Sequence, residues 1–359
     1  MPDSHVVTSV SCGRDHTLAL LDSGKVFGWG RDGSGRIAPS TPEYCSTSKA
    51  PTQAVEVNAQ QRLVSIAAGY GVSLAITAGS QVAVWGASST GIGGRPGSIA
   101  LAMPQYVTDI SEARAIVAGE FLFGAIDAAG TIHTWGLNVE GALGRPTPQL
   151  NALPGPVIAA PPASQLAVGK GYMLALTRAG DLYAWGVNAA GQLGLGHLQS
   201  VARPESLRLK SKFRSIAAGA THALALTTRG EVLAWGSNHH GQLGHAKPAY
   251  SASPLPISLP ERMRNIVAGM HFSLALGESG QVYAWGWNGR GQLGLNDTMD
   301  RSIPVRVPGL TQVRSIAAGE IHAVALTSAA ISGWGNNAAG QIGAADRMQL
   351  RPTTFFTLS

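Results

Sequence analysis

The stretch Ser215–Gly244, SIAAGATHALALTTRGEVLAWGSNHHGQLG, contains the pattern that decides the fold. Three short apolar runs are separated by small residues and glycine, and the stretch ends in Trp235-Gly236 followed by Gly-Gln-Leu-Gly. Runs of four to seven residues suit β-strands and are too short for helices. The connection TTRGE carries a glycine that can adopt the positive φ of a tight hairpin.

The same pattern is written seven times along the chain. Its Trp-Gly pairs begin at Trp29, Trp85, Trp135, Trp185, Trp235, Trp285 and Trp334, with spacings of 56, 50, 50, 50, 50 and 49 residues. A proline marks a further, outer strand at Pro104, Pro154, Pro204, Pro254 and Pro304. Such a period indicates a repeat architecture. We therefore predict an all-β, seven-bladed β-propeller with four-stranded blades, as one domain over residues 1–359.

The two ends of the chain look complementary. Pro352–Leu358 reads as an outer strand with nothing after it, and His5–Gly13 reads as the next strand with nothing before it. We expect the ring to be closed by pairing of the N- and C-terminal strands, which leaves only short, protected edges. The first repeat also carries a Ser/Thr/Pro-rich insertion around Pro39–Thr52.

Composition limits the function classes. Charged residues make up 13% of the 359 residues and hydrophobic residues 45%, which is typical of a packed chain. The formal net charge of +6 favours acidic partners without requiring nucleic acid. No apolar run of about 18 residues predicts a membrane span, and the N-terminus does not resemble a signal peptide.

The two cysteines do not predict a disulfide framework. Cys12 occupies a slot that most other repeats fill with alanine, so we expect it in the core, and Cys45 lies in the insertion. This favours a reducing compartment and a cytoplasmic location. Delivery of a bacterial protein into a host cell is the alternative.

The motifs G-x-x-H-x-x-A-L and G-x-V-x-x-W-G-x-N-x-x-G-Q-L-G resemble the repeat of the RCC1 (regulator of chromosome condensation) family. The resemblance covers nearly the whole chain and is most complete around Trp185, Trp235 and Trp285. It is weaker around Trp85 and in the last repeat, where Ala329-Ala330 replaces the turn glycine. The resemblance implies a seven-bladed propeller and guanine-nucleotide exchange on a Ran-like small GTPase.

Most of the conspicuous side chains fit structural positions. One tryptophan per repeat at a fixed place is what packing between blades requires, so we assign Trp29, Trp85, Trp135, Trp185, Trp235, Trp285 and Trp334 a structural role. His16, His222 and His322 share one position in three repeats. The other four repeats place Val72, Leu122, Tyr172 and Phe272 there, which indicates a packing position.

Function is then expected where the repeats differ, on exposed loops. Strand alternation places the loops after Ala-Gly and after Trp-Gly on one face of the ring. That face is rich in aromatic residues, methionine and arginine, the composition of protein-binding hot spots. Its predicted contact residues are Tyr70, Glu120, Phe121, Glu140, Lys170, His239, His240, Met270, His271, Trp287, Arg290 and Glu320.

The sequence predicts no catalytic residue, cofactor or metal. No nucleophile elbow, phosphate-binding loop or Cys-His pair is present. His239, His240 and His271 come from neighbouring repeats, but no carboxylate or cysteine stands at a ligand spacing beside them. The bases Arg208, Lys210, Lys212 and Arg214 alternate without aromatic residues, so nucleic-acid binding is not expected.

The interpretation that fits these observations is a monomeric, non-catalytic propeller that binds a protein partner through the loop-rich face. Exchange-factor activity on a small GTPase is the first alternative, with Asp15, Asp32, Glu120 and Glu140 available to compete for a phosphate-binding lysine. The insertion has Glu43 as its one acid and forms no acidic wedge. Inhibition of a partner enzyme, as by the propeller-shaped β-lactamase inhibitor, is the second alternative. Ultraviolet sensing would need several tryptophans on the face, where only Trp287 stands.

Overall fold

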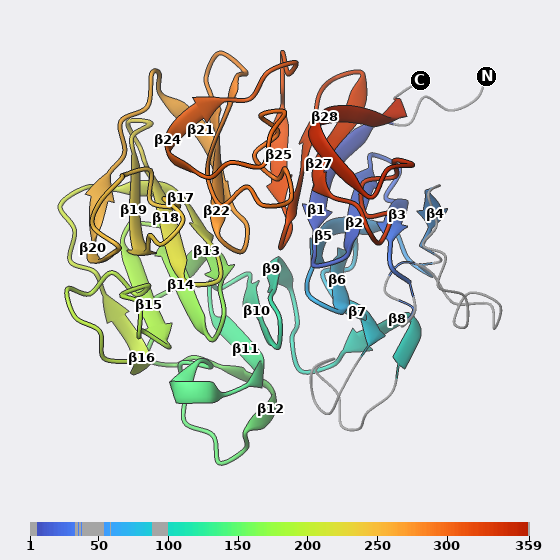
Figure 1. Cartoon of the computed structure of the whole chain (residues 1–359). Coiled ribbons are helices and arrows are strands. Elements are labelled where there is room, and N and C mark those ends of the chain that lie inside the picture. The colour runs from blue at the N-terminus through green and yellow to red at the C-terminus, as the bar shows by residue number, and fades with distance from the viewer. Residues whose placement is uncertain are drawn as a thin grey trace.

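The chain forms a ring of seven four-stranded antiparallel sheets, the blades of a β-propeller (Figure 1). This computed structural model describes residues 6–32, 35, 37, 54–57, 59–87 and 100–357. The insertion at 39–52 and Cys45 therefore lie outside the described residues. The all-β prediction of seven blades with four strands each is confirmed.

Every blade is built from four consecutive strands, ordered from the ring axis outward. Blade 1 holds β1 (Val7–Cys12), β2 (His16–Leu21), β3 (Val26–Gly30) and β4 (Val55–Glu56). Blade 2 holds β5 (Leu63–Ala68), β6 (Val72–Thr77), β7 (Val82–Ala87) and β8 (Ala100–Val107). Blade 3 holds β9 (Ala113–Ala118), β10 (Leu122–Asp127), β11 (Ile132–Leu137) and β12 (Asn151–Pro156), with the short 3-10 turn η1 (Val139–Gly141) before β12. Blade 4 holds β13 (Ala163–Val168), β14 (Tyr172–Thr177), β15 (Leu182–Gly186) and β16 (Val201–Ser206).

The remaining blades repeat this order. Blade 5 holds β17 (Phe213–Ala218), β18 (His222–Thr227), β19 (Val232–Ser237) and β20 (Tyr250–Pro256). Blade 6 holds β21 (Met263–Ala268), β22 (Phe272–Gly277), β23 (Val282–Gly286) and β24 (Arg301–Arg306). Blade 7 holds β25 (Ser315–Ala318), β26 (His322–Leu326), β27 (Ala330–Asn336) and β28 (Met348–Thr357).

The predicted closure by pairing of the N- and C-terminal strands is wrong. Strand β28 pairs with β27 as the outermost strand of blade 7, and β1 pairs with β2 as the innermost strand of blade 1. Side-chain contacts join the two blades instead. Trp29 meets Phe355 and Phe356 edge-to-face, with ring centroids 5.3 and 5.5 Å apart. The Oγ1 of Thr17 lies 3.0 Å from Nε2 of His322.

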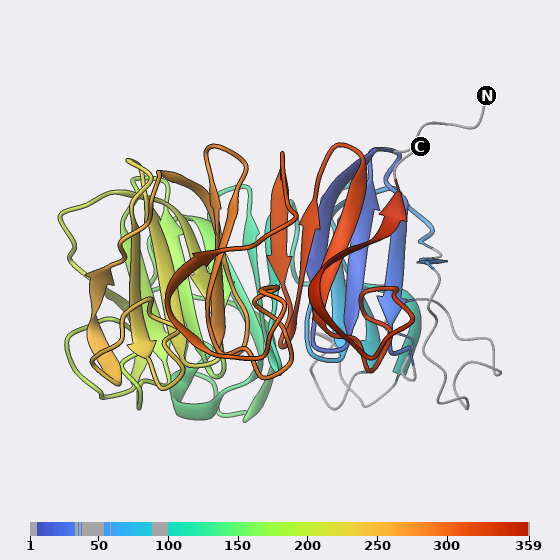
Figure 2. The ribbon, with the colours of Figure 1, turned by 45° about the horizontal axis from the view of Figure 1, so that its top comes forward.

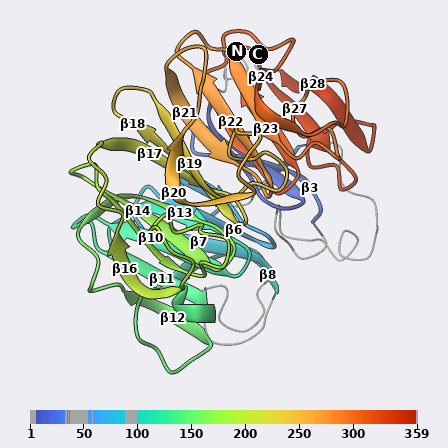
Figure 3. The ribbon, with the colours of Figure 1, turned by 60° about the vertical axis from the view of Figure 1, so that its left-hand side comes forward.

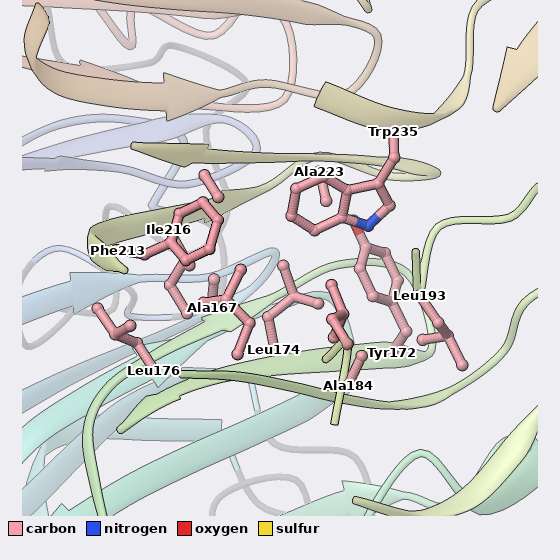
Figure 4. Packing of buried hydrophobic residues seen from close by; sticks show 13 residues of the cluster. Ala167, Tyr172, Leu174, Leu176, Ala184, Leu193, Phe213, Ile216, Ala223 and Trp235 are labelled. Carbon is pink, nitrogen blue, oxygen red and sulfur yellow. The ribbon is translucent and has the colours of Figure 1, made fainter. Parts of the chain in front are cut away.

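The hydrophobic core is divided among the boundaries between blades. Seven clusters of buried residues occur among the described side chains, and each joins two neighbouring blades. In the cluster between blades 4 and 5, the indole of Trp235 lies against Tyr172, Ala223 and Leu193 (Figure 4). Burial of apolar surface between blades therefore holds the ring together.

The loops form two different faces. We call the end that carries the loops between first and second strands, and between third and fourth strands, the loop face. The opposite end, with the tight hairpins and the connections between blades, is the hairpin face. Strand β1 begins and β28 ends on the hairpin face, which is the upper side in Figure 2. Figure 3 shows the blades from another side.

Two further predictions from the sequence concern membrane-spanning segments and the position of Cys12. The part of the chain that is described contains no helix long and apolar enough to cross a membrane. Cys12 is buried as a free thiol, and burial raises its pKa to about 12. At neutral pH it therefore stays a thiol and behaves as a small apolar residue.

Candidate functional site

A glycine shapes the start of each loop on the inner side of the loop face. In blade 5 a Cβ on Gly219 would lie 2.2 Å from Cε1 of His222 and 2.6 Å from the carbonyl oxygen of Gly269. The glycine of blade 6, Gly269, likewise leaves space for the Phe272 ring, whose Cε1 would lie 1.9 Å from a Cβ there. The G-x-x-H motif is thus a packing requirement, because the ring three residues later lies over the glycine.

The histidine position links each blade to the next. Nε2 of His222 lies 2.9 Å from Oγ of Ser273 in blade 6. That hydroxyl donates its own proton to the carbonyl of Gln242, so the imidazole donates through Nε2. His16 and His322 make the corresponding contacts with Ser73 and Thr17. Where the position holds an apolar residue instead, as at Phe272, the facing residue is apolar as well, here Ala323.

The Asn and Gln of the repeat tail build the outer loops of this face. In blade 4, Oδ1 of Asn188 accepts the backbone N–H of Leu193, and its Nδ2 donates to the carbonyls of His197 and Gln199. The Gln192 carbonyl accepts the indole N–H of Trp235 at 2.9 Å. The tail loop is therefore fixed by its own amides and anchored on the next blade, which gives the loop face a rigid base.

The mouth of the central channel is the main concave feature of the loop face. A cavity of ≈ 260 Å³ is lined by the Ala-Gly loops of all seven blades. The residue after the glycine varies between repeats, with glutamate occurring twice: Arg14, Tyr70, Glu120, Lys170, Ala220, Met270 and Glu320. Backbone hydrogen bonds join neighbouring loops around the mouth, and the bond from Glu320 N to Gly13 O, 3.2 Å, spans the boundary of blades 7 and 1. We call these seven residues the mouth ring.

Opposite charges alternate around part of the mouth ring. Nε of Arg14 lies 3.3 Å from the Glu320 carboxylate and 3.6 Å from that of Asp15. Lys170 lies 3.6 Å from Glu120. Burial raises the pKa of Glu320, and the neighbouring carboxylates of Asp15 and Glu120 raise it further, while Arg14 and Lys170 act in the opposite direction. The mouth therefore holds one carboxylate that is costly to keep charged.

Aromatic residues surround the charged groups on two sides. The guanidinium of Arg14 lies over the ring of Tyr70, 4.0 Å from its centroid, and Tyr70 meets Phe121 at 6.0 Å. Phe121 is 38% exposed although it is large and apolar. On the other side, rings of His240 and His271 lie 5.5 Å apart, and His240 also meets Trp287 at 6.1 Å.

The histidine cluster consists of the partly buried imidazoles of His240 and His271 beside Trp287. Burial lowers the pKa of His271, and the nearby positive groups of His240, Lys170 and His239 lower it further. His240 binds the Asp300 carboxylate at 2.9 Å through Nδ1. Among the described residues, no three His, Cys, Asp or Glu side chains are placed to hold a metal ion.

The structure brings together most of the predicted contact residues, but not all. Glu140 lies in η1 of blade 3 and its carboxylate accepts a hydrogen bond from Ser200, apart from the mouth ring. Arg290 takes the equivalent tail position in blade 6 and is exposed, as is His239 in blade 5. Tyr172 and Phe272 are fully buried at the histidine position, and the seven repeat tryptophans are 0–1% exposed.

Arg14 is not among the twelve predicted contact residues, although strand alternation places it on the same face, and it contacts Asp15, Glu320 and Tyr70. It follows the Cys-Gly of blade 1 as Tyr70 follows the Ala-Gly of blade 2, so aligning the residue after the glycine would have identified it. The sequence reasoning also did not identify the hydrogen bond between each histidine of the G-x-x-H motif and a Ser or Thr of the next blade. It could be found by comparing the histidine of one repeat with the residue that follows the equivalent position in the next repeat, as His222 with Ser273.

Comparisons with known proteins agree with this architecture. The RCC1-like domain family matches residues 97–359, and the RCC1 repeat family matches residues 7–36. Human WBSCR16 has a similar structure, with a TM-score of 0.82 at 22% identity over 92% of this chain and 93% of that one. Prp20p of Saccharomyces cerevisiae gives a TM-score of 0.77 at 23% identity, covering 87% of this chain and 80% of Prp20p. At these identities the likeness concerns the fold.

Curated relatives match over shorter segments. The mitochondrial RCC1 domain-containing protein RUG3 of Arabidopsis thaliana is 39% identical over 80 residues, 22% of this chain and 17% of RUG3. The probable E3 ubiquitin-protein ligase HERC6 of Homo sapiens is 34% identical over 86 residues, 24% of this chain and 8% of HERC6. The chain thus spans less than a fifth of the length of these relatives. Seven blades with the repeat motif in each, and a family match over residues 97–359, make the chain a member of the RCC1-like domain family.

Proposed function

We propose that the protein binds a protein partner through the loop face, with the mouth ring and its aromatic neighbours at the centre of the contact. The carrying observation is the combination of Phe121, exposed beside Tyr70, with the His240–His271–Trp287 cluster around a charged cavity. Clustered aromatic side chains with a neighbouring arginine, here Arg14, are typical of binding hot spots. The loops are preorganised by internal hydrogen bonds, so little ordering entropy is lost on binding.

No covalent chemistry is needed for this function. The related propeller Prp20p is described with binding to Gsp1p and histones, and yeast RCC1 with bound Kap60. Those partners belong to those proteins, and the partner of this chain is identified here only by its chemistry. The ion pairs Glu320–Arg14 and Glu120–Lys170, with Tyr70 and Phe121 beside them, favour a partner that presents both acidic and basic side chains next to an apolar contact.

Nucleotide exchange on a small GTPase is the second candidate, and the same carboxylates favour it. An exchange factor acts by binding the nucleotide-free GTPase more tightly than the nucleotide-bound form. Glu120 and Glu320 could accept the lysine that a GTPase otherwise uses for phosphate. Inhibition of a partner enzyme would use the same face and differs only in what the partner does.

The test compares the double variant Phe121→Ala/Trp287→Ala with the wild type. Partner capture from lysates of the source organism and of a eukaryotic cell, followed by calorimetry with the captured protein, measures the affinity. We expect binding to weaken by about 2 kcal/mol or more, because exposed aromatic anchors dominate such interfaces. The unfolding free energy should change by less than about 2 kcal/mol.

A matched control is Ile158→Ala, which removes an apolar side chain that is 88% exposed on the hairpin face. It should bind the partner like the wild type. Equal binding by the double variant would refute the assignment of the loop face. If the captured protein is a small GTPase, nucleotide release measured with Glu120→Gln/Glu320→Gln decides between exchange activity and simple binding.

A further inference from the structure

The hairpin face carries a set of arginines around the other end of the channel. The second residue of the innermost strand, or the residue at that register, is exposed in every blade. In four blades it is an arginine: Arg114, Arg214, Arg264 and Arg314. The remaining blades have Thr8, Val64 and Ser164 there. We call the four arginines the arginine rim, and three of them stand on the consecutive blades 5, 6 and 7.

Hydrogen bonds link the consecutive arginines around the channel. The guanidinium of Arg214 donates to the carbonyl of Met263 at 2.5 Å, and Met263 directly precedes Arg264. The guanidinium of Arg264 donates in the same way to the carbonyl of Val313, which directly precedes Arg314. The guanidinium groups of Arg214 and Arg264 are therefore each held at the backbone of the next blade, directly before its arginine. This arrangement orients the positive groups along the rim instead of leaving them to extend separately into solvent.

The positive charge of the rim is offset only in part within the described residues, because Arg264 is among the groups that lower the pKa of the Glu261 carboxyl. None of the four arginines takes part in the ion pairs found there. Glu261, three residues before Arg264, forms no direct ion pair with it, and its carboxylate accepts hydrogen bonds from Ser279 and Tyr283. Like charges at close range are unfavourable unless an anion is bound between them.

The channel beside the rim contains space and a few polar groups among mainly apolar residues. The channel holds a cavity of ≈ 380 Å³ that is lined by the innermost strands of the blades. Ser215 and Asn265, each adjacent in the chain to a rim arginine, are among its lining residues. A hydroxyl and an amide can add hydrogen bonds to an anion that the guanidinium groups attract.

We propose that the arginine rim binds a compact, soluble molecule that carries several phosphate groups. Guanidinium is suited to phosphate because its N–H groups form two parallel hydrogen bonds with one anion. Three of the arginines stand on consecutive blades and so follow an arc around the channel axis, with Arg114 apart from them on blade 3. A compact ligand with phosphates directed to several sides can meet more of these groups than a linear polyanion does. This site is on the opposite face from the proposed partner surface and does not depend on it.

Isothermal titration calorimetry with the full chain tests the site. The probes are inositol hexakisphosphate and inorganic phosphate, with hexa-aspartate and a six-nucleotide single-stranded DNA as linear polyanions. The main variant is Arg114→Gln/Arg314→Gln, because neither guanidinium makes a hydrogen bond within the described residues and their loss should not affect folding. Lys210→Gln/Arg229→Gln removes the same charge from exposed positions of the hairpin face farther from the axis.

We expect inositol hexakisphosphate to bind the wild type and the control variant alike, and the rim variant about tenfold or more weaker, as the loss of charge-assisted hydrogen bonds implies. Inorganic phosphate and the linear polyanions should bind much more weakly than inositol hexakisphosphate. Equal affinity of the two variants would show that only net charge matters and would overturn the proposal. Tighter binding of either linear polyanion, or absence of binding by inositol hexakisphosphate, would overturn it as well.

Discussion

At the scale of single residues, glycine decides how closely neighbouring blades approach. Gly219 has the ring of His222 on one side and the carbonyl of Gly269 from the next blade on the other. A side chain there would have to displace both a buried ring and a backbone oxygen. The same glycine in the sequence looks like an ordinary turn residue, because its neighbour across the boundary is 50 residues away. Sequence alone could show that the residue recurs, but not what it touches.

Gly219→Ala should therefore destabilise the protein by about 1–3 kcal/mol, the usual cost of overpacking. Gly79→Ala is the matched control, because the nearest atom to a Cβ there is 3.7 Å away. It should change the unfolding free energy by less than about 0.5 kcal/mol. Denaturant titration followed by tryptophan fluorescence measures both, and equal midpoints for the two variants would contradict the packing argument.

The buried histidines of the G-x-x-H motif should make the unfolding free energy depend on pH. Burial lowers the pKa of His222 and of His322 to about 3, against an ordinary value of 6.5. Between those values the unfolded chain binds a proton that the folded protein does not. The unfolding free energy is therefore not reduced by these histidines above pH 6.5. It falls as the pH drops towards 3, by about 1.4 kcal/mol per pH unit for each histidine.

The variant His222→Phe checks this dependence, since Phe272 fills the equivalent position in blade 6. Its unfolding free energy should fall less steeply than that of the wild type between pH 6.5 and 5. The control is His239→Phe, which removes an exposed histidine and leaves the buried ones in place. The expectation fails if both variants keep the slope of the wild type.

At the scale of elements, the outermost strand β28 shows what the repeat pattern could and could not establish. The pattern established that four strands occur per period, because each apolar run is short and bounded by turns. It could not establish which outer strand belongs to which blade, because a periodic sequence reads the same wherever the repeat is taken to begin. The pairing of β27 with β28 settles this for blade 7, and the strand order of the other sheets places each outer strand after its own Trp-Gly strand as well.

Strand β28 also supplies the aromatic contacts between blades 7 and 1, so its side chains should matter for the whole ring. Phe355→Ala removes a ring that meets Trp29 at 5.3 Å. We expect a loss of about 3 kcal/mol, because a half-buried aromatic side chain and a specific ring pair are removed together. Met348→Ala, at the other end of the same strand and 38% exposed, should cost less than about 0.5 kcal/mol. Thermal unfolding by circular dichroism compares the two, and similar midpoints would contradict a closing role for Phe355.

At the scale of the whole molecule, strand alternation predicted which residues share the loop face, but not how they are arranged on it. Alternation was sufficient to place Tyr70, Met270 and Glu320 on one face. It could not show that they share the rim of one cavity with Arg14, because that depends on how seven blades close around an axis. Nor could it separate Glu140, which lies on the same face but binds Ser200.

Because each blade is continuous in sequence, we expect the chain to tolerate a change in where it begins. A circular permutant that joins the present ends by a flexible linker and opens between Lys210 and Ser211 keeps every strand pair intact. Its circular dichroism spectrum should match that of the wild type, with a similar unfolding midpoint. A permutant that fails to fold would show that the contacts between blades 7 and 1 cannot form within one connected segment.

The same continuity has a consequence for how such a ring can change during evolution. A ring closed by strand exchange loses a partner strand whenever its gene is shortened at one end. Here the loss or duplication of one terminal segment of about 50 residues removes or adds a complete sheet, and no strand is left with an unpaired edge where it had a neighbour before. The number of blades can then change by one at a time. The limit is how well the side chains of the new first and last blades pack against each other.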